Sequence, residues 1–165
     1  SEDLVVKKIK ELHKTLIRDF DIERPKIAVL SIDPHAGDNG VIGSKDKTVL
    51  APTIKALYDS GLLVFGPFPS DSFFGSGEYK KFDLIVASFH DQGLIPFKTL
   101  SFGMGVNYTS GLREIRTSPD HGTAYGIAGK GVANKDSFLS SIYLAVDIFK
   151  RRKVYDQLLQ NKLVK

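Results

Sequence analysis

Residues 27–32, Ile-Ala-Val-Leu-Ser-Ile, constrain the fold more than any other stretch, because nearly all of them are apolar. A strand with one solvent-exposed face would alternate apolar and polar side chains, so this run predicts a central strand covered on both faces. Such strands occur in parallel sheets flanked by helices. The segment Asp33-Pro34-His35-Ala36-Gly37 follows directly. It is therefore expected at the carboxyl end of the strand, where open α/β sheets bind ligands.

Helical and strand patterns alternate around this central strand. Apolar residues at three- and four-residue spacing predict an amphipathic helix over residues 3–20. A second helix is expected over about residues 48–60, because Pro52 is tolerated in a first turn and Gly61 suits a helix end. The alternation indicates an α/β fold with an at least partly parallel sheet.

The rest of the chain is expected to contain short strands, two loops and a long helix. The predicted strands are residues 62–65, 82–89, 104–109 and 114–117. The second of these is expected to be buried and to deliver His90 at its end. Residues 67–71 and the glycine-rich residues 120–134 are expected to be loops. A long helix follows and continues into an amphipathic segment at residues 154–159; its apolar stripe consists of Phe138, Ile142, Ala145, Val146 and Phe149.

The chain has 165 residues, 42% hydrophobic and 25% charged, which predicts one compact domain over residues 1–165. Its apolar runs are too short to cross a bilayer, so no membrane span is expected.

The chain starts at Ser1 without a methionine or a secretory pattern, which indicates a processed or excised chain. The lack of cysteine fits the cytoplasm and leaves His, Asp and Glu as metal ligands. The net charge of +4 lies largely on helical faces, and no motif indicates nucleic-acid binding.

Two histidines are candidate metal ligands. His35 and His90 each follow a predicted strand, and neutral imidazole binds divalent transition metals well. On neighbouring strand-end loops they could converge although they are far apart in the sequence. Asp33 and Asp91 could supply an oxygen ligand or orient an imidazole, but both could equally cap helices. Two histidines taken alone are also compatible with local packing or capping.

Lys98, Asn107 and Arg116 form a second candidate group. Their segments are expected to return to the same edge of the sheet. A cation, an amide and a second cation could then clamp a small phosphorylated or carboxylated substrate, with Arg116 offering a bidentate fork. By residue type alone, a surface location is the commoner outcome for Lys98 and Arg116.

Five blocks of sequence, in order across most of the chain, carry a family resemblance. They are residues 34–37 (Pro-His-Ala-Gly), 66–69 (Gly-Pro-Phe-Pro), 90–94 (His-Asp-Gln-Gly-Leu), 103–107 (Gly-Met-Gly-Val-Asn) and 116–124 (Arg-Thr-Ser-Pro-Asp-His-Gly-Thr-Ala). With these blocks the chain resembles the 4-hydroxythreonine-4-phosphate dehydrogenase family of vitamin B6 synthesis. Residues 121–134 also resemble the cofactor loop of isocitrate and isopropylmalate dehydrogenases. The resemblance implies the fold of those enzymes, a mixed sheet flanked by helices.

The resemblance implies roles for the candidate residues. His35 and His90 match two of the family's three metal-binding histidines. Lys98, Asn107 and Arg116 match its substrate-binding positions, and Lys98 is also a possible proton donor. In the family the third histidine lies upstream of the opening helix, and family chains are much longer than this one. This chain is therefore expected to be the C-terminal part of a longer dehydrogenase, truncated at the N-terminus.

The glycine-rich loop is the expected binding region for NAD or NADP. Its small residues would permit close backbone approach to the cofactor, although each glycine taken singly is better explained by a turn with positive φ. His121 could stack against the adenosine part, and Asn134 could read the adenine edge. The usual GxGxxG pattern is absent, so binding would use another design. The expected cofactor-binding residues are His121, Gly122, Thr123, Ala124 and Asn134.

For the full-length enzyme, the resemblance implies NAD-dependent oxidation of 4-phosphohydroxy-L-threonine followed by decarboxylation. A divalent cation (Zn, Mg, Mn or Co) and a homodimer with a shared active site are expected. Asp33, Asp38 and Lys45-Asp46 depart from the commonest family pattern and leave the substrate open, since relatives acting on phosphothreonate or dihydrodiols share the framework. The alternative from another class is a nucleotide- or metal-binding module without turnover, and this chain alone is expected to be inactive.

Overall fold

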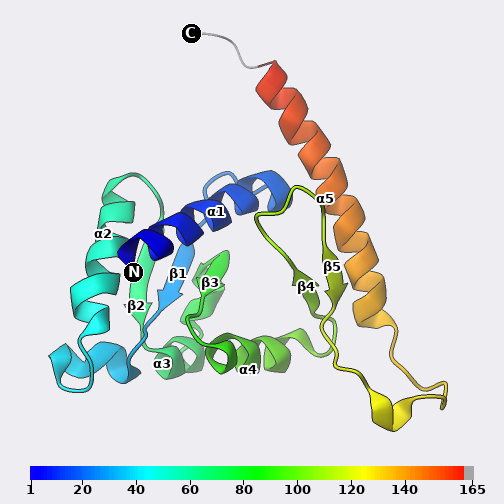
Figure 1. Cartoon of the computed structure of the whole chain (residues 1–165), viewed down its shortest axis with the longest axis horizontal. Coiled ribbons are helices and arrows are strands. Elements are labelled where there is room, and N and C mark those ends of the chain that lie inside the picture. The colour runs from blue at the N-terminus through cyan, green and yellow to red at the C-terminus, as the bar shows by residue number, and fades with distance from the viewer. Residues whose placement is uncertain (162–165) are drawn as a thin grey trace. The chain divides into compact units, whose positions relative to one another are not determined.

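The computed structural model describes residues 1–161, which form two compact units (Figure 1). The first unit contains residues 1–17 and 22–96, and the second contains residues 18–21 and the chain from Phe97 onwards. The single domain expected from the sequence stays a prediction, because two compact units can belong to one domain. None of the helices in the described part of the chain is both long and apolar enough to cross a membrane.

The first unit is built on a parallel three-stranded sheet. Its central strand β1 (Ile27–Leu30) lies between β2 (Val64–Phe68) and β3 (Leu84–Val86), and both neighbours run parallel to it. All four residues of β1 are buried. The prediction of a central strand covered on both faces is therefore confirmed, as is the parallel sheet.

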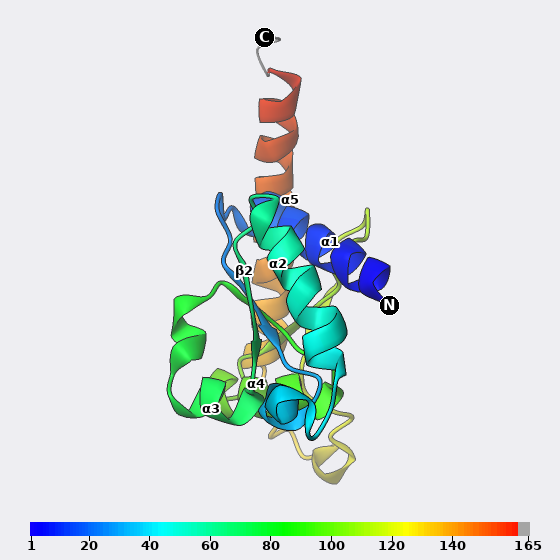
Figure 2. The same cartoon turned by 90° about the vertical axis from the view of Figure 1, so that its left-hand side faces the viewer.

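Two helices of the first unit were predicted, one from apolar spacing and one from residues typical of helix ends, and both are present. α1 (Glu2–Phe20) buries Ile9 and Leu16 of its predicted apolar face. α2 (Ala51–Asp59) follows the short helical segment η2 (Asp46–Leu50) and packs against β2, as Figures 1 and 2 show. Pro52 lies in the first turn of α2. Apolar spacing together with helix-end residues was sufficient to place both helices.

Aromatic rings anchor the segments that connect β2 to β3. These segments are α3 (Ser70–Gly75) and η3 (Glu78–Lys81). Phe73 of α3 is buried, stacks on Phe68 with 5.0 Å between ring centroids and lies 5.7 Å from Phe82. The same rings pack with Ala28 and Leu30 of β1. The position of α3 relative to the sheet is therefore set by aromatic packing.

The residues after Gly66 form a strand and not the predicted loop. β2 continues through Pro67 to Phe68, whose carbonyl oxygen accepts a hydrogen bond from Ser31 N at 2.8 Å, and α3 begins at Ser70. Proline is tolerated because β2 is an edge strand with an irregular register opposite Ala28–Leu30. Gly66 has φ 131°, and the Gly66–Pro67 peptide bond is cis. Glycine and proline thus build an irregular strand here.

The third strand is shorter than predicted and is followed by a helix. β3 ends at Val86, is only partly buried, and leaves Phe89 exposed. His90 begins α4 (His90–Ser101), where a strand-end loop was expected. Gly93 and Pro96 weaken the helical signal in the sequence, which explains why the pattern does not predict this helix.

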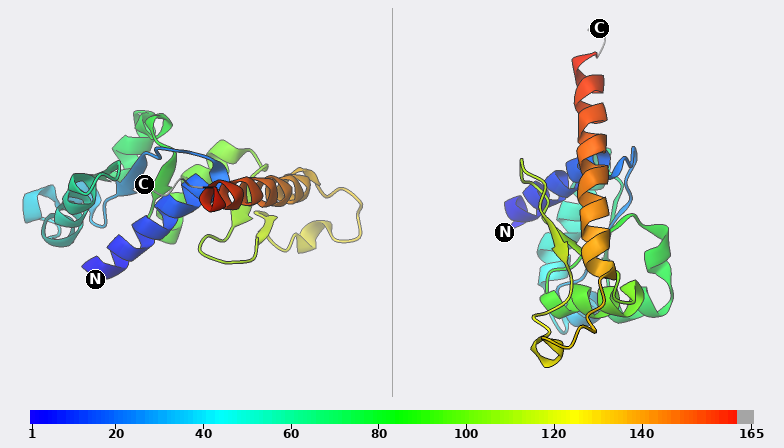
Figure 3. Two further views of the ribbon diagram at one scale, coloured as in Figure 1. Left: turned by 90° about the horizontal axis from the view of Figure 1, so that it is seen from above. Right: turned by 90° about the vertical axis from the view of Figure 1, so that its right-hand side faces the viewer.

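The second unit consists of a two-stranded antiparallel sheet and a long helix. β4 (Val106–Tyr108) pairs with β5 (Thr117–Pro119), and α5 (Asp136–Gln160) packs beside β5 (Figure 3). β4 lies inside its predicted range, whereas β5 overlaps its predicted range only at Thr117. Residues 120–134 form the expected loop, interrupted by the short helical segment η4 (Tyr125–Ile127).

The apolar stripe predicted for α5 is not the buried face of this helix. Phe138 and Phe149 are 55% and 64% exposed, whereas Ser137, Ser141 and Ile148 are buried. Ser137 Oγ donates a hydrogen bond to Gly105 O at 2.7 Å, and Ser141 O accepts one from a β5 threonine. The spacing correctly predicts a helix, but small polar residues form the side that approaches β5.

Candidate active site

A pocket lies beyond the carboxyl ends of β1 and β2 in the first unit. It has a volume of about 280 Å³ and is lined by the segment after β1, by the start of α3 and by the first turn of α4. This is the place where parallel α/β sheets bind ligands. The lining residues are Ser31, Ile32, Asp33, Pro34, His35, Ser70, Asp71 and Gln92. One of the two candidate metal-binding histidines therefore lies in the pocket.

His35 is carried by a left-handed turn formed by residues 35–40. Its φ is 51°, and every residue up to Gly40 also has positive φ. This conformation costs roughly 1–2 kcal/mol for each residue other than glycine, so other contacts must hold it. At the end of the turn, Val41 N donates a hydrogen bond to Asp38 O at 3.1 Å. Before the turn, the carboxylate of buried Asp46 accepts hydrogen bonds from Ile32 N at 2.9 Å and from Asp33 N at 2.7 Å. Asp46 thereby fixes the chain directly before His35.

Asp33 brings a carboxylate into the same pocket. Its Oδ2 is buried and has no hydrogen-bond partner in the described part of the chain. The carboxylate lies so close to Gly43 that a Cβ on this glycine would be 2.1 Å from Asp33 Oδ2. Burial of an unpartnered carboxylate oxygen is costly unless a cation or a donor meets it. Asp33 is therefore suited to a cation or to a ligand donor in the pocket.

His90 is the first residue of α4. Its Nδ1 lies 2.8 Å from Asp91 Oδ1, and the two side chains are 78% and 81% exposed. When Nδ1 carries the proton, this contact presents Nε2 to a ligand. The imidazole is thus accessible and has a carboxylate neighbour that can orient it.

The side chains of the first unit fit part of a metal site. Imidazole nitrogens and carboxylate oxygens suit divalent cations such as zinc, manganese and cobalt, and the unpartnered Asp33 Oδ2 adds an available oxygen. Among residues 1–161, however, no group of three or more His, Cys, Asp or Glu side chains is arranged to hold a metal ion. These residues therefore offer an incomplete set of ligands.

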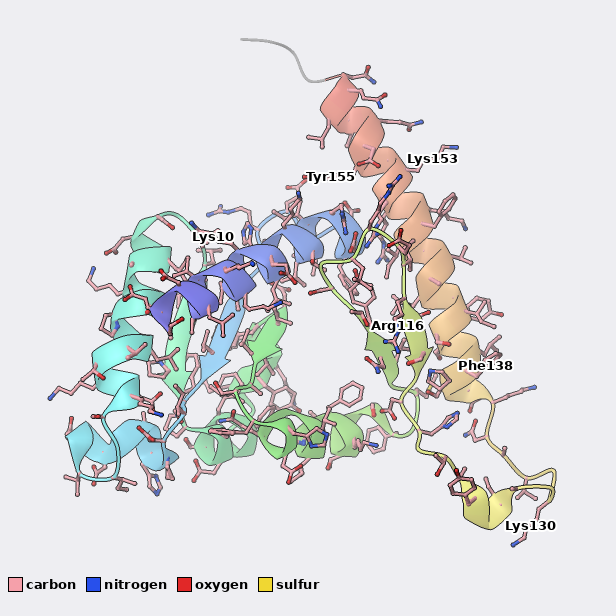
Figure 4. The ribbon with its side chains drawn as sticks, viewed as in Figure 1. Lys10, Arg116, Lys130, Phe138, Lys153 and Tyr155 are labelled. Atoms are coloured by element: carbon pink, nitrogen blue, oxygen red, sulfur yellow. The ribbon has the colours of Figure 1, made fainter. Side chains whose placement is uncertain are left out.

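Asn107 and Arg116 lie on one face of the antiparallel pair in the second unit. Asn107 is opposite Ser118, and two positions along the ladder Thr109 N donates a hydrogen bond to Arg116 O at 3.1 Å. Alternate residues of a strand point to the same face, so the two side chains share it. Arg116 Nη1 also donates to Thr109 Oγ1 at 2.9 Å, and Figure 4 shows Arg116 beside the two strands.

Lys98 reaches the end of β5 from α4. Its Nζ donates to Asp120 O at 3.4 Å and lies 4.0 Å from Asp120 Oδ1. Asp120 Oδ2 is buried without a hydrogen-bond partner in the described residues, and a Cβ on Gly105 would lie 2.3 Å from it. Lys98 and Asp120 therefore place a cation and a carboxylate directly before His121.

The residues expected to bind the cofactor occupy an exposed loop of the second unit. Residues 121–124 are all exposed, and Ala124 has φ 54°. His121 Nδ1 lies 3.0 Å from Gly122 O. Asn134 Oδ1 accepts a hydrogen bond from the backbone N of Asp136, the first residue of α5, at 2.7 Å. The side-chain oxygen of Asn134 therefore makes a structural hydrogen bond, in addition to the role in cofactor binding predicted for this residue.

A buried charge cluster, formed by Arg18, Asp19, Tyr108 and Arg152, also lies in the second unit. Asp19 accepts hydrogen bonds from Arg18 Nε at 2.7 Å, from Arg152 Nε at 2.8 Å and from the Tyr108 hydroxyl. Burial opposes ionisation of Asp19, but these hydrogen bonds outweigh it and hold the pKa of the carboxyl far below its ordinary value. Burial and the neighbouring Asp19 raise the pKa of Tyr108. No pattern in the sequence predicts this cluster.

Comparison with known proteins decides the family. The model of the family described as pyridoxal phosphate biosynthetic protein PdxA matches residues 1–145. The chain belongs to the PdxA family. Curated 4-hydroxythreonine-4-phosphate dehydrogenases from Bacteroides thetaiotaomicron and Prosthecochloris aestuarii are 49% and 51% identical to it, over 93% and 83% of this chain. The alignments cover 42% and 40% of those relatives, so the chain spans less than half of their length.

Solved structures agree with membership of the PdxA family. A 4-hydroxythreonine-4-phosphate dehydrogenase from Klebsiella pneumoniae is similar with a TM-score of 0.75 and 42% identity, covering 90% of this chain and 44% of that one. A terephthalate 1,2-cis-dihydrodiol dehydrogenase from Burkholderia xenovorans is similar with a TM-score of 0.67 and 28% identity, covering 89% and 46%. The family resemblance expected from the sequence is confirmed.

Proposed function

We propose that this chain is part of an NAD-dependent dehydrogenase that oxidises 4-phosphohydroxy-L-threonine in pyridoxal phosphate (vitamin B6) synthesis. The secondary alcohol of the substrate would become a ketone, and the resulting β-keto acid would lose carbon dioxide. The PdxA match over residues 1–145 carries this proposal. The position of His35 in a pocket beyond the parallel strands supports it.

We assign His35 and His90 to a divalent cation such as zinc, magnesium, manganese or cobalt. When bound, such a cation lowers the pKa of the substrate hydroxyl and polarises the ketone. Asp33 would supply its unpartnered oxygen or orient a ligand. Because residues 1–161 do not gather three metal-binding side chains, the proposal includes a further ligand from outside this chain.

Lys98, Asn107 and Arg116 are proposed to hold the substrate. Arg116 would bind a phosphate or carboxylate through two parallel N–H donors of its guanidinium group. Asn107, on the same face of the sheet, would fix the orientation of the substrate. Lys98 would bind a second anionic group and serve as proton donor. The neighbouring Asp120 would keep the Lys98 ammonium group at the end of β5.

The remaining parts of the proposal concern the cofactor and the assembly. We assign NAD, or NADP, to the loop containing residues 121–124 and to Asn134. The fold would be that of isocitrate and isopropylmalate dehydrogenases, and the chain would form the C-terminal part of a longer, cytoplasmic enzyme. Two subunits would share the active site, so that the cation receives ligands from both.

A second candidate is a dehydrogenase acting on 4-phosphothreonate or a dihydrodiol. The similarity to the Burkholderia xenovorans enzyme, named for a dihydrodiol substrate, favours this alternative. Its 28% identity is lower than the 42% of the Klebsiella pneumoniae structure. The phosphorylated threonine derivative therefore remains the first choice.

A chimeric enzyme tests the proposed activity. We would fuse this chain to the part of the Bacteroides thetaiotaomicron relative that lies outside the 42% covered by the alignment. With NAD, a divalent cation and 4-phosphohydroxy-L-threonine, the chimera is expected to produce NADH. His35→Ala should lower its kcat/KM at least about 100-fold, because a cation ligand is lost. His13→Ala, on α1, is the control and should leave turnover unchanged.

Three results would contradict parts of this proposal. A folded chimera that produces no NADH would point to a binding module without turnover. NADH formed only from a dihydrodiol or 4-phosphothreonate would establish the second candidate. Sustained NADH production by the 165-residue chain alone would contradict the requirement for ligands from outside it.

A further inference from the structure

The side chain of Gln92 uses all of its hydrogen-bonding groups to join three segments of the first unit. Its Nε2 donates to Ser31 O and to Ser70 Oγ, both at 2.7 Å. Its Oε1 accepts hydrogen bonds from Ser88 N at 3.0 Å and Phe89 N at 3.4 Å. A primary amide has two N–H donors and one oxygen with two lone pairs. The Gln92 amide is therefore fully satisfied by protein groups.

Each partner of Gln92 lies beyond a different strand of the parallel sheet. Ser31 follows β1, Ser70 follows β2, and Ser88 follows β3. Through its hydrogen bonds, one side chain thus links the segments that follow the carboxyl ends of all three strands. Gln92, Ser31 and Ser70 also line the pocket that contains His35.

Gln92 also belongs to the helix turn that carries the second candidate ligand. His90 is the first residue of α4, and Gln92 comes two residues later in the same turn. The hydrogen bonds from Ser88 N and Phe89 N hold the chain directly before His90. The orientation of this turn relative to the pocket is therefore constrained by the Gln92 amide.

We infer that Gln92 is a positioning residue, which fixes the His90 turn against the His35 pocket and so sets the geometry of the cation ligands. This inference rests on the proposed function, because it assumes that both histidines bind the cation. Glutamate cannot replace the amide: it lacks the two donors and would place a charged oxygen near Ser31 O. Alanine would remove all four hydrogen bonds.

A zinc titration tests the positioning role. The imidazole NMR signals of His35 and His90 are followed in the full 165-residue chain as Zn²⁺ is added. In Gln92→Ala and Gln92→Glu, the Kd for Zn²⁺ is expected to rise about 10–100-fold, the usual effect of removing a group that orients metal ligands. Thr53→Val is the matched control. It deletes a hydrogen bond of the same unit, from Oγ1 of buried Thr53 to Val49 O at 2.7 Å, and should leave the Kd unchanged.

Amide hydrogen exchange separates failure of this inference from failure of the metal proposal. Exchange at Ser88 and Phe89 should become faster in Gln92→Ala than in Thr53→Val, because Gln92 Oε1 accepts their N–H groups. If neither the wild-type chain nor the chimera binds Zn²⁺, the metal assignment is wrong, and faster exchange at these two amides still supports a role of Gln92 in holding the three segments together. Unchanged exchange in Gln92→Ala, or a Kd for Zn²⁺ equal to that of the wild type, would overturn the inference.

Discussion

Replacing Asp19 with alanine is expected to lower the free energy of unfolding by about 3–5 kcal/mol, the usual loss when one partner of a buried ion pair is removed. The Asp19 side chain is fully buried, and its partners Arg18 and Arg152 are 22% and 12% exposed. Alanine would leave two largely buried guanidinium groups without a carboxylate. Urea unfolding followed by circular dichroism measures the change. Asp147→Ala, at an exposed site on α5, should change the free energy by less than about 0.5 kcal/mol.

The contribution of Asp19 should also depend on pH in a defined direction. The folded protein holds the pKa of Asp19 well below its ordinary value, whereas the unfolded chain has the ordinary value of about 3.9. The ionised carboxylate therefore stabilises the fold above about pH 4, and this stabilisation is lost as the pH falls towards the folded-state pKa. The difference in unfolding free energy between the wild type and Asp19→Asn should be constant near neutral pH and shrink below about pH 4. A difference that grows on acidification would contradict the charge cluster.

Gly66→Ala is expected to lower the free energy of unfolding by about 3 kcal/mol. Part of this loss comes from the φ of 131°, which an L-residue rarely adopts. The larger part comes from close packing, because a Cβ would lie 2.3 Å from Val29 O in the central strand. Neither backbone can move without disturbing the β1–β2 pairing. The same urea unfolding experiment measures the effect.

Gly61→Ala separates the two contributions. Gly61 also has a positive φ, 96°, but a Cβ there would meet no atom within 4 Å. This control should therefore lose only about 1 kcal/mol, from the backbone conformation alone. Equal losses of unfolding free energy in Gly61→Ala and Gly66→Ala would contradict the close contact between Gly66 and Val29 O.

Elements whose burial follows from local spacing were predictable from the sequence. Residues 27–30 are apolar at every position, and the strand they form is buried on both faces. Ile9 and Leu16 share one face of a helix by spacing alone, and both are buried. In these segments the apolar positions in the sequence are the positions buried in the fold, so the sequence pattern alone is sufficient to predict the element.

Two features that depend on tertiary position, the strand at residues 66–68 and the buried face of α5, were predicted wrongly. Gly66 and Pro67 indicate a loop locally, but an edge position in the sheet allows them to continue a strand. Phe138 and Phe149 repeat with helical spacing, yet the side of α5 that approaches β5 contains Ser137 and Ser141. Spacing along one segment carries no information about what packs against it.

The candidate site was predictable only in part, for the same reason. His35 could be placed because its motif directly follows a recognisable strand, and the strand-end rule then applies. The role of Gln92 depends on Ser31, 61 positions away in the sequence, and the Asp19–Arg152 pair spans 133 positions. Contacts of this kind arise from the fold, and no local pattern predicts them.

A Zn²⁺ titration of the wild type, His35→Ala and His13→Ala tests the central claim most directly, because it measures the proposed cation site without requiring turnover. Isothermal titration calorimetry gives the Kd of each protein. We expect His35→Ala to bind Zn²⁺ at least about tenfold more weakly than the wild type, since even loss of a residue that only orients a ligand has this effect. His13→Ala should bind like the wild type. Equal Kd values for the wild type and His35→Ala would contradict the assignment of His35 as a ligand.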